Sequence, residues 1–211
     1  CNPNNPTSTA ITRKDMRKIL DRAMQFGISV MVDETYEEFT DAGSKISSIP
    51  LTNNYNNLIV LRGISKFFAA PGLRLGYAVT GNPDLLKYIN TKKNPWTINS
   101  LAEIAGCIMF SDKEYIEKTR ALITSERNRL YELMSTWEHV KVYPSCSNFL
   151  LVKILREDVT SEMVFDHCIR KGLMIRDCST FPFLDNSFIR FCVMSPEKND
   201  ELMEALKELG L

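Results

Sequence analysis

The sequence has no net charge, no long apolar run and no closely spaced pair of cysteines. Its 26 basic residues balance 26 acidic ones, so nothing indicates a polyanionic partner such as a nucleic acid. No apolar run approaches the ~18 residues that a membrane-spanning helix needs. No basic-then-apolar signal segment opens the chain either. We therefore expect neither a nucleic-acid partner nor a membrane protein.

Cysteine and histidine are present without the spacing that would give them a joint role. The six cysteines form no C-x-x-C motif and stand mostly among apolar neighbours; they are Cys1, Cys107, Cys146, Cys168, Cys178 and Cys192. This pattern predicts reduced, buried thiols in a cytoplasmic protein. His139 and His167 have no second ligand at metal spacing, so we expect no metal site.

What is present indicates a globular protein with a substantial core. The 211 residues are 44% apolar and 25% charged, which is typical of a chain that forms one domain or one and a half. The chain opens on Cys1-Asn2-Pro3-Asn4-Asn5-Pro6-Thr7, a motif-like stretch that normally needs a strand before it to position it. We therefore expect the chain to be the later part of a longer protein.

The first half follows the pattern of an α/β fold. Thr12 is placed to cap a helix that ends near Phe26 and Gly27. The apolar runs 28–32, 58–61 and 75–79 predict strands, and we expect the first to be buried on both faces. Chemistry-bearing residues follow the first two runs, which is typical of a doubly wound, mostly parallel sheet.

The second half is α+β in character. Asn82-Pro83 begins a helix to about residue 92, 101–110 is an apolar helix, and Ser111 could cap a long helix through Trp137. Beyond it we expect strands at 140–143, 149–152, 173–176 and 188–193, with a helix at 161–171 that Gly172 closes and another at 195–210. We assign 1–114 to the later portion of a large domain and 115–211 to a smaller α+β domain.

Lys66 lies in the stretch around which the chain is organised, a turn between two apolar runs. Taken alone it fits a solvated loop lysine. Four features nevertheless occur in a fixed order, and together they contain seven candidate residues: Asn5 in NNPT, Asp33 and Tyr36 in DETY, Ser65 and Lys66 with Arg74 eight residues later, and Arg190 in FIRF.

In this order and at these intervals, the features closely resemble fold-type I pyridoxal-phosphate (PLP) enzymes of the class I/II aminotransferase family. Within that family, the branch of histidinol-phosphate aminotransferase and threonine-phosphate decarboxylase is most similar to three segments of this chain: NPNNPT, SKFFAAPGLRLGY and LMIRDCSTFPFLDNSFIRF. The resemblance covers essentially the whole chain. It implies a PLP-dependent transferase fold.

The resemblance assigns Lys66 to the Schiff base with PLP and to proton transfer at the substrate. Asp33 would pair with the pyridine nitrogen, where a carboxylate favours the protonated ring; the alternative is a turn cap. Tyr36 and Asn5 would donate to the ring's phenolate oxygen, and Tyr36 could otherwise be a core aromatic residue.

Arginines supply the anion sites that the resemblance implies. Ser65 and Arg74 would hold the cofactor phosphate, and Arg190 would take the substrate carboxylate as a bidentate pair. The alternative for Arg74 is a surface ion pair. Arg176 would contact a phosphate at the far end of the substrate. An ion pair of Arg176 with Asp177 or Asp185 is an equally good reading of the sequence.

The chain departs from the family pattern at two positions and in its extent. Ser8 stands where the family usually has glycine, and Gly63 where many members have serine or threonine, so one phosphate donor is lost. The glycine-rich phosphate loop, the aromatic residue that stacks on the ring and the N-terminal arm are absent from these 211 residues. We do not expect residues 1–211 alone to hold the cofactor fully or to turn over.

The resemblance implies an aminotransferase that uses an amino acid, which could be phosphorylated, and a 2-oxo acid. A decarboxylase of the threonine-phosphate type is the nearest alternative, because the two reactions differ in which substrate bond stands perpendicular to the ring. A non-catalytic domain that senses PLP or an amino acid, and a structural remnant, are the other readings. The resemblance also implies a homodimer, with the apolar 101–110 helix as a candidate interface element.

Overall fold

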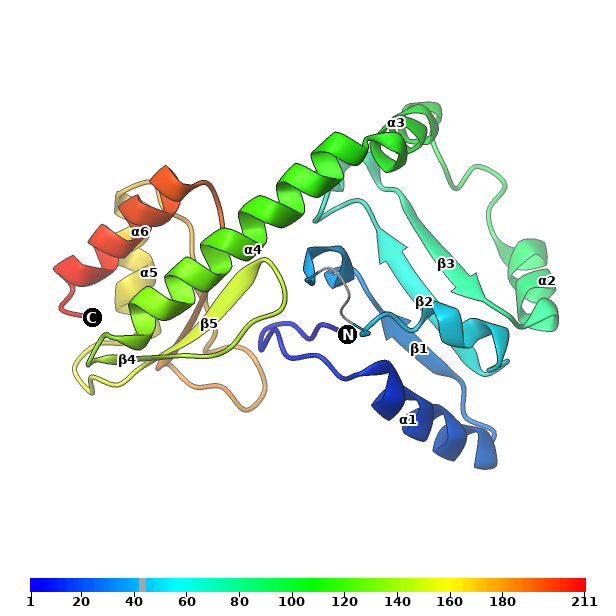
Figure 1. Cartoon of the computed structure of the whole chain (residues 1–211), viewed down its shortest axis with the longest axis horizontal. Coiled ribbons are helices and arrows are strands. Elements are labelled where there is room, and N and C mark those ends of the chain that lie inside the picture. Colours follow the sequence, from blue (N-terminus) through cyan, green and yellow to red (C-terminus); the bar gives the residue numbers. More distant parts are fainter. Residues whose placement is uncertain (42–44) are drawn as a thin grey trace. The chain divides into compact units, whose positions relative to one another are not determined.

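The computed structural model describes residues 1–41 and 45–211 (Figure 1). These residues form two compact units. The first unit comprises Cys1–Pro3 and Ala10–Thr119, and the second comprises Asn4–Thr9 and Arg120–Leu211. The assignment of 1–114 to a large domain and of 115–211 to a smaller one stays a prediction.

The first unit is built on a three-stranded sheet in the order β1-β2-β3, with β1 at Val30–Asp33, β2 at Leu58–Gly63 and β3 at Gly76–Thr80. β1 and β2 are parallel, whereas β3 runs antiparallel to β2. Helix α1, Arg13–Gln25, packs on this sheet through a core of Met16, Leu20, Val32, Leu51, Leu58 and Val60. Thr12 caps α1 as predicted by accepting the Asp15 N–H, and Gly27 has the expected positive φ of 65°.

The prediction that the first strand is buried on both faces is wrong. The strand begins at Val30, and Met31 is 64% exposed. β1 is an edge strand of the three-stranded sheet, and only its Val32 side chain is buried. The apolar run gave no sign of this one-sided burial, because Ile28, 54% exposed, is as apolar as the core residues.

Short 3₁₀ turns and three helices complete the first unit. The turns are η1 (Glu37–Phe39), η2 (Ile49–Asn53) and η3 (Pro71–Leu73), and the helices are α2 (Pro83–Lys92), α3 (Ser100–Ser111) and α4 (Lys113–Ser135), which continues into the second unit. Ser111 does not cap the long helix. It is the last residue of α3, and Asp112 instead accepts the Tyr115 N–H at 2.9 Å, because the carboxylate stands one residue before the first turn of α4.

The second unit contains an antiparallel sheet in the order β4-β5-β7-β6, with β4 at Val140–Val142, β5 at Phe149–Ile154, β6 at Arg176–Asp177 and β7 at Phe188–Cys192. Helices α5 (Ser161–Arg170) and α6 (Pro196–Glu208) complete it. The predicted strand at 173–176 is reduced to the two residues of β6. Gly172 ends the α5 turn with a φ of 76°, as its position after the helix predicted.

All six cysteines are free thiols, and their predicted burial is only partly correct. Cys168 and Cys178 are buried, and burial raises the pKa of each thiol to about 11. Cys1, Cys107 and Cys192 are exposed. Among the residues that the structure describes, no helix is both long and apolar enough to cross a membrane.

Candidate functional site

The turn that carries Lys66 begins where β2 ends. Two backbone bonds close it: Ile64 N–H donates to Leu75 O at 3.3 Å and Ala70 N–H to Ile64 O at 3.4 Å. Phe67 and Phe68 are 2% and 8% exposed, so the turn is fixed by its own aromatic side chains. The Lys66 side chain is exposed, and its amine has no hydrogen bond or ion pair with any residue the structure describes.

Aromatic packing holds this turn against its neighbours in the first unit. The Phe67 ring lies 5.1 Å from Phe39 and 6.2 Å from Tyr115, and the Phe68 ring stacks on Tyr115 at 5.7 Å. The Tyr115 hydroxyl donates to Phe67 O at 2.9 Å. These contacts reduce the mobility of the backbone on both sides of Lys66.

The segment after Lys66 contains two residues in the left-handed region. Ala69 has φ 49° and Arg74 has φ 57°. Neither is a glycine, so each costs about 1–2 kcal/mol of backbone strain. Arg74 is exposed and donates to Pro71 O at 2.9 Å. It makes no ion pair with any described residue, so the surface ion pair that could have explained Arg74 is not formed.

Asp33 and Tyr36 follow the carboxyl end of β1. Thr35 donates to Asp33 Oδ1 through its backbone N–H at 2.9 Å and its hydroxyl at 2.5 Å. Oδ1 therefore caps a turn, as the structural reading of Asp33 predicted. Oδ2 has no hydrogen-bond partner among the described residues and is available to a ligand. Tyr36 is 8% exposed and belongs to the core of the first unit.

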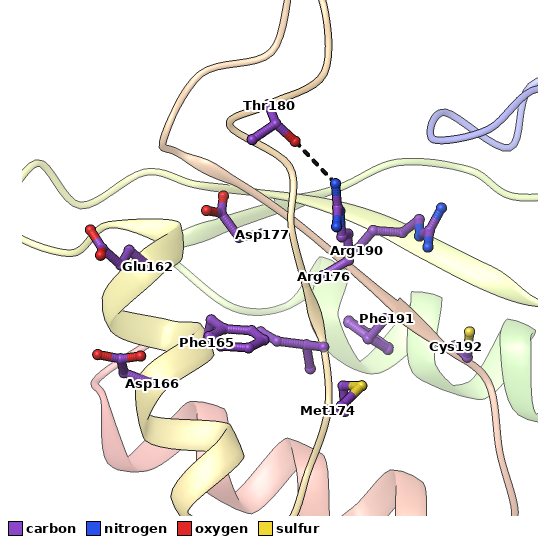
Figure 2. Close-up of a pocket in the computed structure, with 11 residues that line it drawn as sticks. Glu162, Phe165, Asp166, Met174, Arg176, Asp177, Thr180, Arg190, Phe191 and Cys192 are labelled. Atoms are coloured by element: carbon purple, nitrogen blue, oxygen red, sulfur yellow. Dashed lines mark hydrogen bonds between the residues drawn. The ribbon is translucent and has the colours of Figure 1, made fainter.

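A cavity of about 630 Å³ lies in the second unit (Figure 2). Its lining includes Arg176 and Arg190, which face each other directly across the β6–β7 ladder. Figure 2 shows the carboxylates of Glu162 and Asp166 on α5, apart from the two guanidinium groups. Two like charges directly opposite each other on a sheet are unfavourable unless an anion lies between or beside them. The arginine side of the cavity therefore suits an anionic ligand.

Arg176 is exposed rather than buried, and its partners are neutral. It donates to the Thr180 hydroxyl at 3.0 Å and lies 5.3 Å from the centre of the Phe181 ring. The predicted alternative of an ion pair is not formed within the described chain. Asp177 accepts from Ser161 and Ser179, and Asp185 from Ser187. Burial would raise the pKa of Asp177, but the Ser179 N–H and the two hydroxyls hold it below its ordinary value.

Arg190 is half-buried and only partly satisfied. It donates to Asn5 Oδ1 and lies 4.9 Å from the centre of the Phe149 ring. Its Nε is buried and has no hydrogen-bond partner among the described residues. A guanidinium with a free buried donor and an aromatic neighbour is prepared to take a carboxylate.

The structure distributes the eight predicted residues over both units. The first unit contains Asp33, Tyr36, Ser65, Lys66 and Arg74, and the second contains Asn5, Arg176 and Arg190. Three of them are brought together directly in the second unit, through the Asn5–Arg190 hydrogen bond and the Arg176–Arg190 strand pair.

Sequence reasoning noted Ser8 only as a departure from the family pattern and did not single out Arg62, so it missed the supporting role of both residues. Ser8, at φ 55° and 1% exposed, receives N–H bonds from Cys146 at 3.2 Å and Ser147 at 3.0 Å. It therefore anchors the loop that carries Asn5. Arg62 forms ion pairs with acidic residues that follow Asp33 and Tyr36. The sequence offered two signals for this cluster: an arginine four residues before Lys66, and three glutamates after β1. Only the register of β1 on β2 shows that the arginine pairs with these glutamates.

Comparison with known proteins gives one consistent result. The sequence profile of the family described as aminotransferase class I and II matches residues 1–206. A histidinol-phosphate aminotransferase of Thermoanaerobacter pseudethanolicus is 41% identical over 211 residues, which are all of this chain and 56% of that protein. The chain thus spans little more than half the length of such curated relatives.

Solved structures support the same fold. The crystal structure of the histidinol-phosphate aminotransferase from Clostridium acetobutylicum superposes with a TM-score of 0.92 at 34% identity, over 99% of this chain and 62% of that one. The L-threonine-O-3-phosphate decarboxylase from Porphyromonas gingivalis gives 0.86 at 25% identity, over 99% and 62%. The predicted fold class is therefore confirmed.

Proposed function

Because the chain belongs to the class I and II aminotransferase family, we propose that the whole protein is a PLP-dependent aminotransferase. Its substrates would be an amino acid that carries a phosphate and a 2-oxo acid. The observation that supports a phosphate group on the substrate is the Arg176–Arg190 pair in the second unit. One arginine suits a carboxylate, and a second one beside it calls for a second anionic group.

The described residues of the first unit fit PLP as a ligand. They supply an amine without a partner at Lys66, a free carboxylate oxygen at Asp33 and an exposed guanidinium at Arg74. When bound, PLP supplies an aldehyde that captures amines and a ring that draws electrons from the attached carbon. Lys66 would anchor it, Asp33 would hold the ring nitrogen protonated, and Ser65 and Arg74 would bind its phosphate.

Lys66, Arg190 and Asn5 would also act on the substrate. Lys66 Nζ, once neutral, would take the proton from the substrate Cα as a general base. Arg190 would bind the α-carboxylate and thereby fix which Cα bond is exposed to reaction. Asn5 accepts from Arg190 through Oδ1, and its Nδ2–H donors, which have no partner among the described residues, would bind a ligand oxygen. Tyr36 would add a phenolic donor to the cofactor.

A decarboxylase is the second candidate, because the P. gingivalis structure similar to this chain acts on a threonine phosphate. The same residues serve both reactions. Loss of Cα–H and loss of CO₂ differ in how the carboxylate is turned, and Arg190 controls that rotation. We rank transamination first because the aminotransferase structure is the better match of the two, with a TM-score of 0.92 at 34% identity against 0.86 at 25%. The sequences separate the two reactions less, since a relative named as a threonine-phosphate decarboxylase is 38% identical and the aminotransferase 41%.

A single turnover of the whole, PLP-loaded protein separates these candidates. Phosphorylated and plain amino acids are mixed with it, and the form of the cofactor and the release of CO₂ are followed together. Conversion to the pyridoxamine form without CO₂ supports the aminotransferase. CO₂ with the aldehyde form retained supports the decarboxylase. No reaction with any amino acid, although PLP is bound, would favour a sensing domain.

We further propose that the whole protein is a homodimer located in the cytoplasm. Helix α3 buries only Ala102 and Gly106, while Leu101 is 74% and Ile108 64% exposed. An apolar surface of this kind is typical of a protein–protein interface. Sedimentation of the whole protein should give twice the monomer mass, and Ile108→Glu should shift it towards the monomer.

A further inference from the structure

Arg62 forms a buried ion cluster in the first unit. Its guanidinium lies 2.8 Å from Glu34, 2.7 Å from Glu37 and 2.6 Å from Glu38. The side chains are shielded from water, with 11% of Arg62, none of Glu34 and 13% of Glu37 exposed. We refer to these four residues as the Arg62 cluster.

The cluster has one positive group for three carboxylates. Burial alone would lower the pKa of Arg62, but the charges of Glu37 and Glu34 outweigh it and hold that pKa above its ordinary value. Glu34 also accepts the Ser48 N–H and the Ser47 hydroxyl, the latter at 3.0 Å. Without Arg62, three carboxylates would lie close together in a site that is largely shielded from water. Their mutual repulsion would then strongly favour their separation.

The members of the cluster come from two segments that carry candidate PLP ligands. Glu34 directly follows Asp33, and Glu37 and Glu38 directly follow Tyr36. Arg62 lies on β2, four residues before Lys66. The pairing of Asp33 with Leu61 and the bond from Glu34 N–H to Leu61 O join the same two strands. The Phe39–Phe67 contact at 5.1 Å connects the two segments again beyond the cluster.

We propose that Arg62 is a positioning residue, which fixes the Asp33–Tyr36 segment relative to the Ser65–Lys66 turn. This role rests on the proposed function, because it matters only if both segments hold one cofactor. The Arg62 guanidinium is engaged by three glutamates, so we assign it no contact of its own with the cofactor. Its contribution is to keep the Asp33 carboxylate at the end of β1 and the Lys66 amine on the turn after β2 at a constant separation.

Amide hydrogen exchange of the cofactor-free whole protein tests the positioning itself. The relevant amides are bonded in the structure: Glu37 to Glu34 O and Thr40 to Glu37 O in one segment, Ala69 to Lys66 O and Ala70 to Ile64 O in the other. Arg62→Met should accelerate exchange in both segments together, by about tenfold or more. Arg62→Lys keeps the charge but loses the planar fork, so it should accelerate them less.

Arg129→Met is the matched control. Arg129 pairs with Glu126 and Asp200 in the second unit, so its loss removes an arginine that also binds more than one carboxylate, although it is more exposed, at 39% against 11% for Arg62. It should leave exchange at 34–40 and 64–70 unchanged. Glu38→Gln removes only the most exposed carboxylate of the Arg62 cluster, 28% exposed, and remains informative if Arg62→Met does not fold.

Equilibrium binding of PLP completes the test. At a temperature where all variants are folded, Arg62→Met should bind PLP about 10- to 100-fold more weakly than the parent, and Arg129→Met should bind it equally well. A lower melting temperature with unchanged exchange in both segments and unchanged PLP affinity would overturn the proposal. A parent protein that binds no PLP would overturn the proposed function, whereas the exchange data would still decide whether Arg62 fixes the two segments.

Discussion

Each unit contains a cluster of buried or partly buried ions, and the two clusters differ in what they hold. In the first unit, Arg62 joins strand ends that lead to Asp33 and Lys66. In the second, Glu126 of α4 accepts hydrogen bonds from Arg129 on the same helix and from Asn199 on α6, and so joins the two helices. The candidate ligands beyond β1 and β2 depend on this ion cluster for their proposed placement, whereas Arg176 and Arg190 are fixed by the strand register itself.

Lys66→Ala should have the largest effect on function and almost none on stability. It should abolish amino transfer, because no other described group is proposed to anchor PLP and move the Cα proton. The free energy of unfolding should change by less than about 0.5 kcal/mol, because the side chain is exposed. Turnover and urea unfolding measure both quantities, with Lys87→Ala on α2 as a control. Turnover retained in Lys66→Ala would mean that the Arg62 cluster supports no catalytic lysine, and the proposed difference between the two ion clusters would be lost.

Arg176→Ala should weaken the binding of phosphorylated amino acids by about 1.5–3 kcal/mol, the range for hydrogen bonds to charged groups. Affinity for the unphosphorylated amino acid should change little, because Arg190 still takes the carboxylate. Competition binding to the whole protein measures the difference. Equal losses for both amino acids, or no loss for either, would assign Arg176 to structure.

Ser8 allows a test of loop support in the second unit. Ser8→Ala should cost about 1–3 kcal/mol of stability, because the N–H groups of Cys146 and Ser147 each lose the nearer of their two acceptors. Ser8→Gly loses the same bonds but relieves the left-handed strain at φ 55°, about 1–2 kcal/mol. Thermal unfolding should therefore rank the glycine variant above the alanine variant. The reverse order would mean that backbone strain at Ser8 is unimportant.

Glu126→Gln should have the smallest effect, about 1 kcal/mol at neutral pH. The bonds from Arg129 and Asn199 hold the pKa of Glu126 below its ordinary value of 4.5. The carboxylate therefore stabilises the folded protein fully above pH 4.5, and this contribution disappears as the pH falls through the lowered pKa. Unfolding of parent and variant should converge in acid. A constant difference at every pH would exclude this ionic contribution.

Local sequence signals predicted the elements well. The Thr12 cap, the Asn82-Pro83 start and the glycines after α1 and α5 all have a short-range physical cause, and the structure confirms them. The prediction that β1 is buried on both faces was wrong, because burial depends on which elements cover the sheet. The run 28–33 contains no information on that point.

The candidate site was recognisable only as a set of separate residues. Asn5 and Arg190 are 185 residues apart in sequence, and their hydrogen bond depends on the tertiary fold. Likewise, Arg62 could have paired with any of several acids, and only the register of β1 on β2 selects Glu34. Roles carried by one residue type in one motif are predictable, whereas support from a distant segment is not.

The most direct test of the central claim is to locate the lysine that holds PLP. The whole, PLP-loaded protein is treated with borohydride, digested and analysed by mass spectrometry. We predict that the cofactor is fixed to Lys66, on the turn between β2 and β3. Attachment to another lysine, or bound PLP that borohydride does not fix, would contradict the role assigned to Lys66.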